Sequence, residues 1–468
     1  MLMKRFLLSF ALFVGLILPA MAVTDGQVYP EINGMKIANQ WIFDQVHTRD
    51  AYSASVINAN YARTATMIGD EVYVGRSLYI PVTDENLQSA ILVYSAIDGS
   101  FLREMPLTLD GNPYCTFLGA TSVGKDSFGH LWVAPMTSNV VNEVPVYICD
   151  PQSGALTLVT EMDKGGILYR TDYLDVLGDL TLEQAECNIM TAAGSSESAG
   201  FPTIYRWHGD QDGDWGPGFY GTDCYLDLLY FYPETKTGLS LAPIVKMCED
   251  PLNEDTRYSG ELFYIDCYDA APVLYDLDGN IIDTFEYADP AAQPRTYRSN
   301  GVLDFTIDGR AFIVYTIADM NNDGNGCQAM ICEYNDPSMM SFDNMTPMWT
   351  IPADSLGKVN DSGLRVHCFA TEKSVDDEGN EVVTLLTFKA QNGMAVYKIG
   401  KNVEAPQPQG KKGDVDGNGE VDGTDLNILI NILLGKDQNN YEGRENVDEQ
   451  GGVDGNDLNA LINILLGK

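Results

Sequence analysis

Between residues 23 and about 405, short runs of Val, Ile, Tyr and Phe alternate with turns of the Asp-Gly and Asn-Gly type, and helical periodicity is nearly absent. Such runs are typical of β-strands joined by tight turns. One arrangement recurs: an acidic or Gly-containing turn, an apolar strand, and a returning strand that ends in another turn, as at residues 125–133 and 307–314. The pattern predicts a mainly β domain built from repeated small sheets.

These repeated units, each roughly 50 to 60 residues long, predict a six-bladed β-propeller, in which radial four-stranded blades protect their sheet edges. A strand at residues 37–43 is expected to join the last blade as its outer strand and close the ring, and residues 126–134 resemble the blade strands of six- and seven-bladed propellers. A seven-bladed propeller and a β-sandwich pair remain alternatives. The six expected blades lie at residues 60–110, 111–165, 166–222, 223–290, 291–345 and 346–400.

The hydrophobic period changes after residue 412. Apolar residues then recur at spacings of three and four, which predicts a helix with one buried stripe, ended by Gly435. The expected stripe comprises Leu426, Leu429, Ile430, Leu433 and Leu434. The same 23-residue unit follows at an offset of 32, with 17 of 23 positions identical, so residues 414–436 and 446–468 form a tandem repeat.

Each repeat begins with oxygen-bearing residues at positions 1, 3, 5, 9 and 12 of a loop and has Gly at position 6, a spacing suited to calcium. A main-chain carbonyl at position 7 completes the set. The second loop has amides at positions 1 and 5, and its lower charge predicts a weaker second calcium site. The expected ligands are Asp414, Asp416, Asn418, Glu420 (main chain), Asp422 and Asp425 in the first loop, and Asn446, Asp448, Gln450, Gly452 (main chain), Asp454 and Asp457 in the second.

With Asp at position 12 and no helix before either loop, residues 413–468 resemble a type I dockerin module, joined to the propeller by a linker at residues 401–412. The resemblance implies a cohesin-like receptor or surface complex as the partner. A different receptor, or merely two stacked helices that close the C-terminus, are the alternatives, because the expected contact positions depart from the pairs common in that family. These positions are Gly423, Thr424, Ile430 and Asn431, with Gly455, Asn456, Ile462 and Asn463 in the second repeat.

The other end of the chain predicts export. Lys4 and Arg5 precede an apolar run at residues 6–18 and a small-residue site that ends at Ala22, so residues 1–22 are expected to be a signal peptide. The mature protein should be secreted, extracellular or periplasmic. A formal net charge of −39 argues against nucleic acid and acidic membranes as partners, because both are bound through Lys and Arg. No second apolar span follows, which predicts no membrane span.

Chemistry inside the propeller is not readable from local motifs. The four histidines are too far apart for a zinc motif, and the nine cysteines have no paired spacing, so most are interpreted as small buried residues. The most suggestive stretch, residues 205–232, mixes aromatic and acidic residues as sugar sites do. Packing between blades beside a solvated acidic turn is the favoured interpretation of it. The candidate glycan contacts are Trp207, Trp215, Tyr220 and Asp212.

Two functions of different class follow from the sequence. In the first, the propeller recognises polysaccharide or another glycan and the calcium module docks the protein to a receptor. In the second, the propeller is a glycoside hydrolase or polysaccharide lyase of a degrading complex, but 67 acidic residues hide any catalytic pair. A carboxylate pair at the propeller axis would favour the enzyme, and an apolar, plugged axis would favour the binder.

Overall fold

The chain divides into two units, Val28–Glu404 and Ala405–Lys468, each described by itself below. The computed structural model describes residues 29–44, 62–76, 88–116, 118–137, 141–164, 170–194, 203–216, 227–230, 244–249, 254, 256–266, 272–284, 301–318, 327–334, 346–353, 356, 367–390, 392–404, 413–416, 421–437, 439, 441, 445–448 and 452–466. The expected signal peptide and residues 405–412 of the expected linker lie outside this set.

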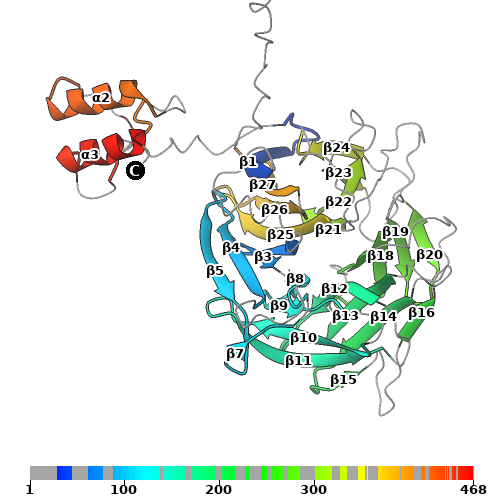
Figure 1. Cartoon of the computed structure of the whole chain (residues 1–468). Helices are drawn as coiled ribbons and strands as arrows, with labels where there is room; N and C mark the ends of the chain where they lie inside the picture. Colours follow the sequence, from blue (N-terminus) through cyan, green and yellow to red (C-terminus); the bar gives the residue numbers. More distant parts are fainter. Residues whose placement is uncertain are drawn as a thin grey trace, which may run out of the picture. The chain divides into compact units, whose positions relative to one another are not determined.

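Within the described residues, the strands of the larger unit form six sheets arranged around a centre, so the unit is a six-bladed β-propeller (Figure 1). The first three blades have the orders β2-β3-β4-β5, β8-β9-β10-β11 with β6 and β7 beyond β11, and β12-β13-β14-β15 with β16 also on β14. Their bounds are β2 (Ala62–Ile68), β3 (Glu71–Arg76), β4 (Ala90–Ser95), β5 (Phe101–Pro106), β6 (Thr108–Leu109), β7 (Asn112–Pro113), β8 (Ser122–Lys125), β9 (Leu131–Ala134), β10 (Glu143–Cys149), β11 (Ala155–Asp163), β12 (Arg170–Gly178), β13 (Cys187–Gly194), β14 (Thr203–Gly209), β15 (Trp215–Gly216) and β16 (Asp227–Tyr230).

The other three blades have the orders β17-β18-β19-β20, β21-β22-β23-β24 and β25-β26-β27-β1. Their bounds are β17 (Ile244–Met247), β18 (Leu262–Asp266), β19 (Val273–Asp276), β20 (Ile281–Thr284), β21 (Val302–Ile307), β22 (Arg310–Ala318), β23 (Cys327–Tyr334), β24 (Thr346–Ile351), β25 (His367–Val375), β26 (Glu381–Lys389), β27 (Gly393–Gly400) and β1 (Lys36–Asp44).

Three of the expected blade limits are wrong. Strand β6 pairs with β11, so the second blade begins before residue 111. Strand β16 pairs with β14, so the third blade extends beyond residue 222. Strand β24 pairs with β23, so the fifth blade extends beyond residue 345 and the sixth begins later than expected. The physical reason is that the turn pattern marks where strands end, whereas the blade to which an outer strand belongs is set by pairing with its neighbour.

Alternating strand residues place one apolar cluster between each pair of consecutive blades. In one cluster Tyr73 and Val93 of the first blade meet Val133 of the second, and in another Met190 of the third blade meets Phe263 of the fourth. Similar clusters join the second blade to the third, the fourth to the fifth, the fifth to the sixth and the sixth to the first. The stabilising apolar burial, roughly 25 cal/mol per Å² of apolar surface, is therefore distributed around the whole ring.

The N-terminal strand closes this ring, as expected from the sequence. Strand β1 pairs antiparallel with β27 and becomes the outer strand of the last blade. On it, Trp41 is fully buried between the last blade and the first, where its indole nitrogen donates a 2.8 Å hydrogen bond to the carbonyl of Ala96. The turn residue Gly99, with φ +72°, lies so close that a Cβ there would come 2.8 Å from the indole. Trp41 therefore connects the first blade to the last blade of the ring.

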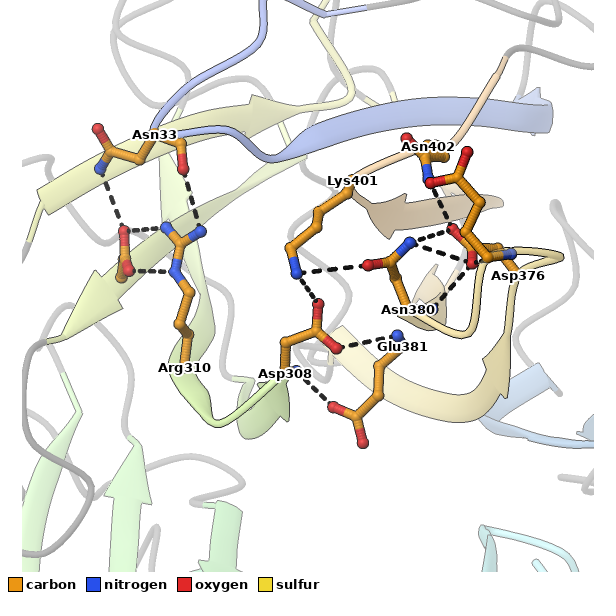
Figure 2. Close-up of polar contacts among 10 residues, drawn as sticks. Asn33, Asp308, Arg310, Asp376, Asn380, Glu381, Lys401 and Asn402 are labelled. Atoms are coloured by element: carbon orange, nitrogen blue, oxygen red, sulfur yellow. Dashed lines mark hydrogen bonds and ion pairs between the residues drawn. The ribbon is translucent and has the colours of Figure 1, made fainter.

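Polar contacts reinforce the last two blades at the turns near this closure (Figure 2). Arg310 forms a two-point ion pair with Glu333, both contacts 2.7 Å, and also donates to the carbonyl of Asn33. In the neighbouring turns, Lys401 pairs with Asp308 at 2.6 Å, and the main-chain N–H of Glu381 donates to the same carboxylate at 3.0 Å. These contacts tie the N-terminal turn, the fifth blade and the end of β27 together.

The Asp308 contacts predict sensitivity to acid. Hydrogen bonds from Lys401 and from the main chain of Glu381 hold the pKa of Asp308 below its ordinary value. A carboxyl whose pKa is lowered by folding stabilises the protein above its unfolded pKa of about 3.9, and this contribution is lost as the pH falls through the folded pKa. We therefore expect the melting temperature of Asp308→Asn to fall less steeply than that of the wild type between about pH 5 and pH 3. Parallel curves in a pH series of thermal melts would contradict this.

The smaller unit contains two helices of identical length, α2 (Gly423–Leu433) and α3 (Gly455–Leu465). Each begins with an aspartate N-cap whose side chain accepts a main-chain N–H, Asp422 from Thr424 and Asp454 from Asn456. Gly435, with φ +67°, follows the first helix as expected. The helices pack through one core whose fully buried members are Val415, Leu429, Val447 and Leu461.

The expected apolar stripe of the first helix is only partly correct. Leu429 is buried and Leu426 packs against the core, but Leu433 is 36% exposed and Leu434 is 60% exposed. Both lie at the C-terminal end of α2, and Ile428 packs against the core instead. The corresponding Leu465 and Leu466 of the second repeat are 38% and 61% exposed. Each repeat thus ends in an exposed leucine pair. Across the described residues, no helix has the length and apolar character needed to cross a membrane.

Candidate functional sites

In the first repeat, the loop folds its carboxylates together at the start of α2. Carboxylate oxygens of Asp414, Asp416 and Asp425 lie within 4.8 Å of one another. Asp414 is 1% exposed and Asp425 is fully buried. Three carboxylates packed this closely repel each other unless a cation lies among them, and a hard cation with oxygen ligands suits this set. The residues present therefore fit calcium.

Asp425 also organises the loop backbone. Its two carboxylate oxygens accept N–H hydrogen bonds from Asp416 at 3.1 Å and from Asp422 at 2.8 Å. Asp425 thereby holds loop positions 3 and 9 at the N-terminus of α2. Its negative charge also interacts favourably with the positive end of the helix dipole. Calcium at this position would neutralise the charge of the cluster.

The second loop repeats this backbone geometry with fewer charges. Asp457 is fully buried and accepts N–H hydrogen bonds from Asp448 at 3.0 Å and from Asp454 at 2.7 Å. Burial opposes the ionised form of Asp457, but these hydrogen bonds outweigh it and lower its pKa. Position 1 is Asn446 where the first loop has Asp414. Of the other expected ligands, Gly452 is exposed, and Asn418, Glu420 and Gln450 lie outside the described residues.

The expected partner contacts lie on the two repeats at matching places. Gly423 and Thr424 at the start of α2, and Gly455 and Asn456 at the start of α3, are exposed. Further along the helices, Asn463 is exposed, whereas Ile430, Asn431 and Ile462 are half-buried. These positions and the exposed leucine pairs together give each repeat a solvent-facing surface made of similar residues.

The aromatic stretch of the third blade lies mainly in packing. Trp207 is 7% exposed, belongs to the cluster between the second and third blades, and donates to the hydroxyl of Thr160 at 3.1 Å. Trp215 packs against the same cluster. Asp212 lies in an exposed turn, where its main-chain N–H donates a hydrogen bond to the carboxylate of Asp210. Tyr220 lies outside the described residues. The ring faces of these two tryptophans are thus largely occupied by protein.

Along the axis of the propeller lies a cavity of about 410 Å³, lined by the innermost strands of all six blades. Charged residues line it from several blades, and three of them lie on consecutive blades: Asp175 on β12, Lys246 on β17 and Asp304 on β21. Lys246 pairs with one oxygen of Asp175 at 2.7 Å, and the main-chain N–H of Met247 donates to the other at 2.7 Å. Among the described residues, the axis is therefore lined by charged as well as apolar side chains and leaves a cavity.

Local sequence reasoning did not find these axial residues. Their signal is a charge inside an otherwise apolar strand, as at Asp175 between Leu174 and Val176, or at Lys246 between Val245 and Met247. Such a charge is costly unless it is paired or faces water. That signal identifies a residue but not its partners, because the partners come from other blades.

A second polar group, close to the cavity wall, is explained by packing between blades. Both oxygens of Asp126 accept main-chain hydrogen bonds, and one also contacts Nδ1 of His130 at 2.8 Å. The carboxylate of Asp179 is bound by the main chain and hydroxyl of Thr181 and by the N–H of Gln184. These contacts join the second and third blades and use the oxygens that a metal would need.

Comparison with known proteins supports this division into a module and a propeller. Residues 412–466 match the family model described as the Dockerin type I domain. Dockerin modules bind calcium and cohesin receptors, and dockerin proteins are typically extracellular or attached to the cell surface. No curated protein matches the chain significantly.

Among solved structures, the chain is similar to a DUF4623 family protein from Bacteroides eggerthii, with 11% identity, a TM-score of 0.52, and coverage of 82% of this chain and 84% of that one. It is also similar to AofleA from Arthrobotrys oligospora (8% identity, TM-score 0.40, 71% and 82% coverage). A third is the GH43_1 enzyme from Xanthomonas citri (11% identity, TM-score 0.30, 60% and 87% coverage). The first likeness supports the fold alone, and the other two are too weak to carry an argument.

Proposed function

We propose that this protein is secreted, that residues 413–468 dock it through two calcium sites to a cohesin-like receptor, and that its propeller recognises a polysaccharide or another glycan. The observation that carries the proposal is the dockerin match over residues 412–466. The duplicated loops, with equivalent hydrogen bonds to Asp425 and Asp457, support two sites, and Asn446 in place of an aspartate supports a weaker second one.

The docking surface in this proposal comprises the exposed helix starts and the leucine pairs at the helix ends. Leu434 and Leu466 each expose about 60% of their surface on a module with a very small core. Exposed apolar residues at matching places on two repeats suit a protein partner. Such residues are costly in water, and burial against a receptor would recover part of that cost.

The docking proposal predicts calcium-dependent capture of the full chain by cohesin. Immobilised cohesins from several types should retain the protein in 1 mM calcium and release it in EGTA. Leu434→Asp combined with Leu466→Asp should weaken retention at least tenfold, because the leucines face the solvent and their loss leaves the core intact. Asp110→Asn, on a propeller turn, is the control. Retention that is equal in calcium and EGTA would contradict the proposal.

A second function, cleavage of glycosidic bonds, is favoured by one observation: two carboxyl groups, Asp175 and Asp304, reach the axial cavity. Glycoside hydrolases use such a pair as acid and base or nucleophile. Incubation of the full chain with plant, host and microbial polysaccharides, followed by mass spectrometry of soluble products, separates the two functions. Defined oligosaccharides would establish the enzyme, whereas binding without products would establish recognition.

A further inference from the structure

The axial cavity has the size of a small-ligand site. Its volume of about 410 Å³ lies within the roughly 300 to 1,000 Å³ typical of such pockets. Aromatic side chains, including Tyr173, Phe305 and Phe369, share its wall with the polar groups. An apolar wall with a few convergent polar groups is the usual composition of a site that orients a small molecule.

Lys246 is the best-placed polar group in this cavity. It lies deep in the propeller, yet 27% of its side chain is exposed, and this surface faces the cavity. Burial opposes its charge, but the carboxylate of Asp175 outweighs burial and raises the pKa of Lys246. Lys246 therefore stays an ammonium with N–H donors beyond the one used by Asp175, available to a ligand oxygen.

Asp304 complements Lys246 as a hydrogen-bond acceptor. Asp175 uses one oxygen for Lys246 and the other for a main-chain N–H. By contrast, none of the described side chains donates a hydrogen bond to Asp304, which lines the cavity near Lys246. The main-chain N–H of Asp304 itself donates to this carboxyl. A carboxylate offers about four lone-pair sites, so it can accept further hydrogen bonds from a ligand.

Most of the cations that line the cavity are paired with carboxylates, and Lys373 donates instead to the hydroxyl of Thr306. Lys125 pairs with Glu372 at 2.5 Å, Lys246 with Asp175 at 2.7 Å and Arg257 with Glu249 at 2.9 Å. A charged ligand would therefore meet little net attraction. Hydroxyl groups both donate and accept, so they can satisfy an ammonium and a carboxyl at once, while the C–H face of a sugar ring packs on an aromatic wall.

We propose that the axial cavity is the sugar site of the propeller, an inference that rests on the proposed glycan recognition. The site takes one neutral sugar unit whose hydroxyls accept a hydrogen bond from Lys246 and donate one to Asp304. Asp175 positions the ammonium of Lys246. The candidate residues of the aromatic stretch in the third blade, such as Asp212, then lie outside the site.

The site carries a pH signature. Burial raises the pKa of Asp304 to about 6. The charge of Lys246 opposes this rise, and the carboxylates of Glu249 and Asp175 add to it. Cys248, Tyr264 and Tyr334 also face it, and burial keeps their pKa values above the ordinary ones. With a pKa of about 6, Asp304 therefore changes charge between pH 5 and 8. An ionised carboxylate accepts the stronger hydrogen bond, so affinity should rise about fivefold to tenfold as the pH rises through 6.

The test uses the full chain and trisaccharides of xylose, glucose, mannose and galactose, screened by saturation-transfer NMR and titrated by calorimetry from pH 5 to 8. For a trisaccharide that binds, Asp304→Asn should weaken binding at least tenfold and remove the inflection near pH 6. Asp212→Asn is the matched control and should bind like the wild type. A second variant, Asp175→Asn with Lys246→Met, removes the ion pair without leaving either charge alone, and it should also lose binding. Thermal melts establish that each variant is folded.

The outcomes separate the two proposals. If no trisaccharide binds the wild type, glycan recognition by the propeller fails and the sugar site fails with it. If one binds and Asp304→Asn keeps both the affinity and the pH inflection, the axial site alone is wrong. Loss of binding in Asp212→Asn would place the site at the exposed turn of the third blade instead.

Discussion

Removal of calcium from the full chain is expected to unfold Ala405–Lys468 and to leave the propeller folded. Among its described residues the smaller unit has four fully buried apolar side chains, which is too small a core to offset the ordering of its chain. Its buried carboxylates Asp414 and Asp425 add repulsion that calcium removes. At free calcium a thousandfold above Kd, one site contributes about 4 kcal/mol. Calorimetry in calcium should show two transitions, and EGTA should abolish the smaller one.

Variants separate the contribution of the metal from that of the backbone contacts. Asp414→Ala with Asp425→Ala removes both metal ligands and the hydrogen bonds that Asp425 accepts, so the smaller transition should disappear even in calcium. Asp414→Asn keeps the shape and those hydrogen bonds and should only raise the calcium concentration needed. Asn446→Ala should cost less than Asp414→Ala if the second site is weaker, and Glu404→Ala should change nothing. A smaller transition unaffected by EGTA would show that the core suffices.

The features that the sequence predicted correctly are those set by neighbouring residues. The helix after each loop and the stop at Gly435 depend on residues close together in the sequence, and the structure places them as expected. The six blades also follow from local strand and turn signals. Strand β1 was predictable because an unpartnered apolar strand at the start of a propeller has one free edge to join, that of β27.

Features that depend on pairing between distant segments were not predictable. The short β6, β16 and β24 carry no local sign of the blade to which they belong, so three blade limits were wrong. The axial site draws Asp175, Lys246 and Asp304 from three strands, with 71 residues between the first two and 58 between the last two, and only the ring geometry brings them to one cavity. Leu433 and Leu434 fit the helical period but are exposed, because burial is set by packing between the two repeats and not by the period alone.

Trp41→Ala is expected to destabilise the propeller by about 3 to 5 kcal/mol, the usual cost of truncating a fully buried aromatic side chain. The loss combines the cavity left between the last and first blades with the hydrogen bond to Ala96. Urea unfolding followed by intrinsic fluorescence and circular dichroism would measure it. Trp41→Phe should cost less, because most of the apolar contact remains.

Trp207→Ala is the matched control, because it also removes an indole buried between two blades and a hydrogen bond, here to Thr160. The second and third blades that flank it are consecutive along the chain, whereas the blades that Trp41 joins are the first and the last. Both variants should lose stability, but amide hydrogen exchange in β1 and β27 should accelerate only in Trp41→Ala, because only that variant loosens the ring closure. Slow exchange in β1 of Trp41→Ala would mean that the β1–β27 hydrogen bonds close the ring without the tryptophan.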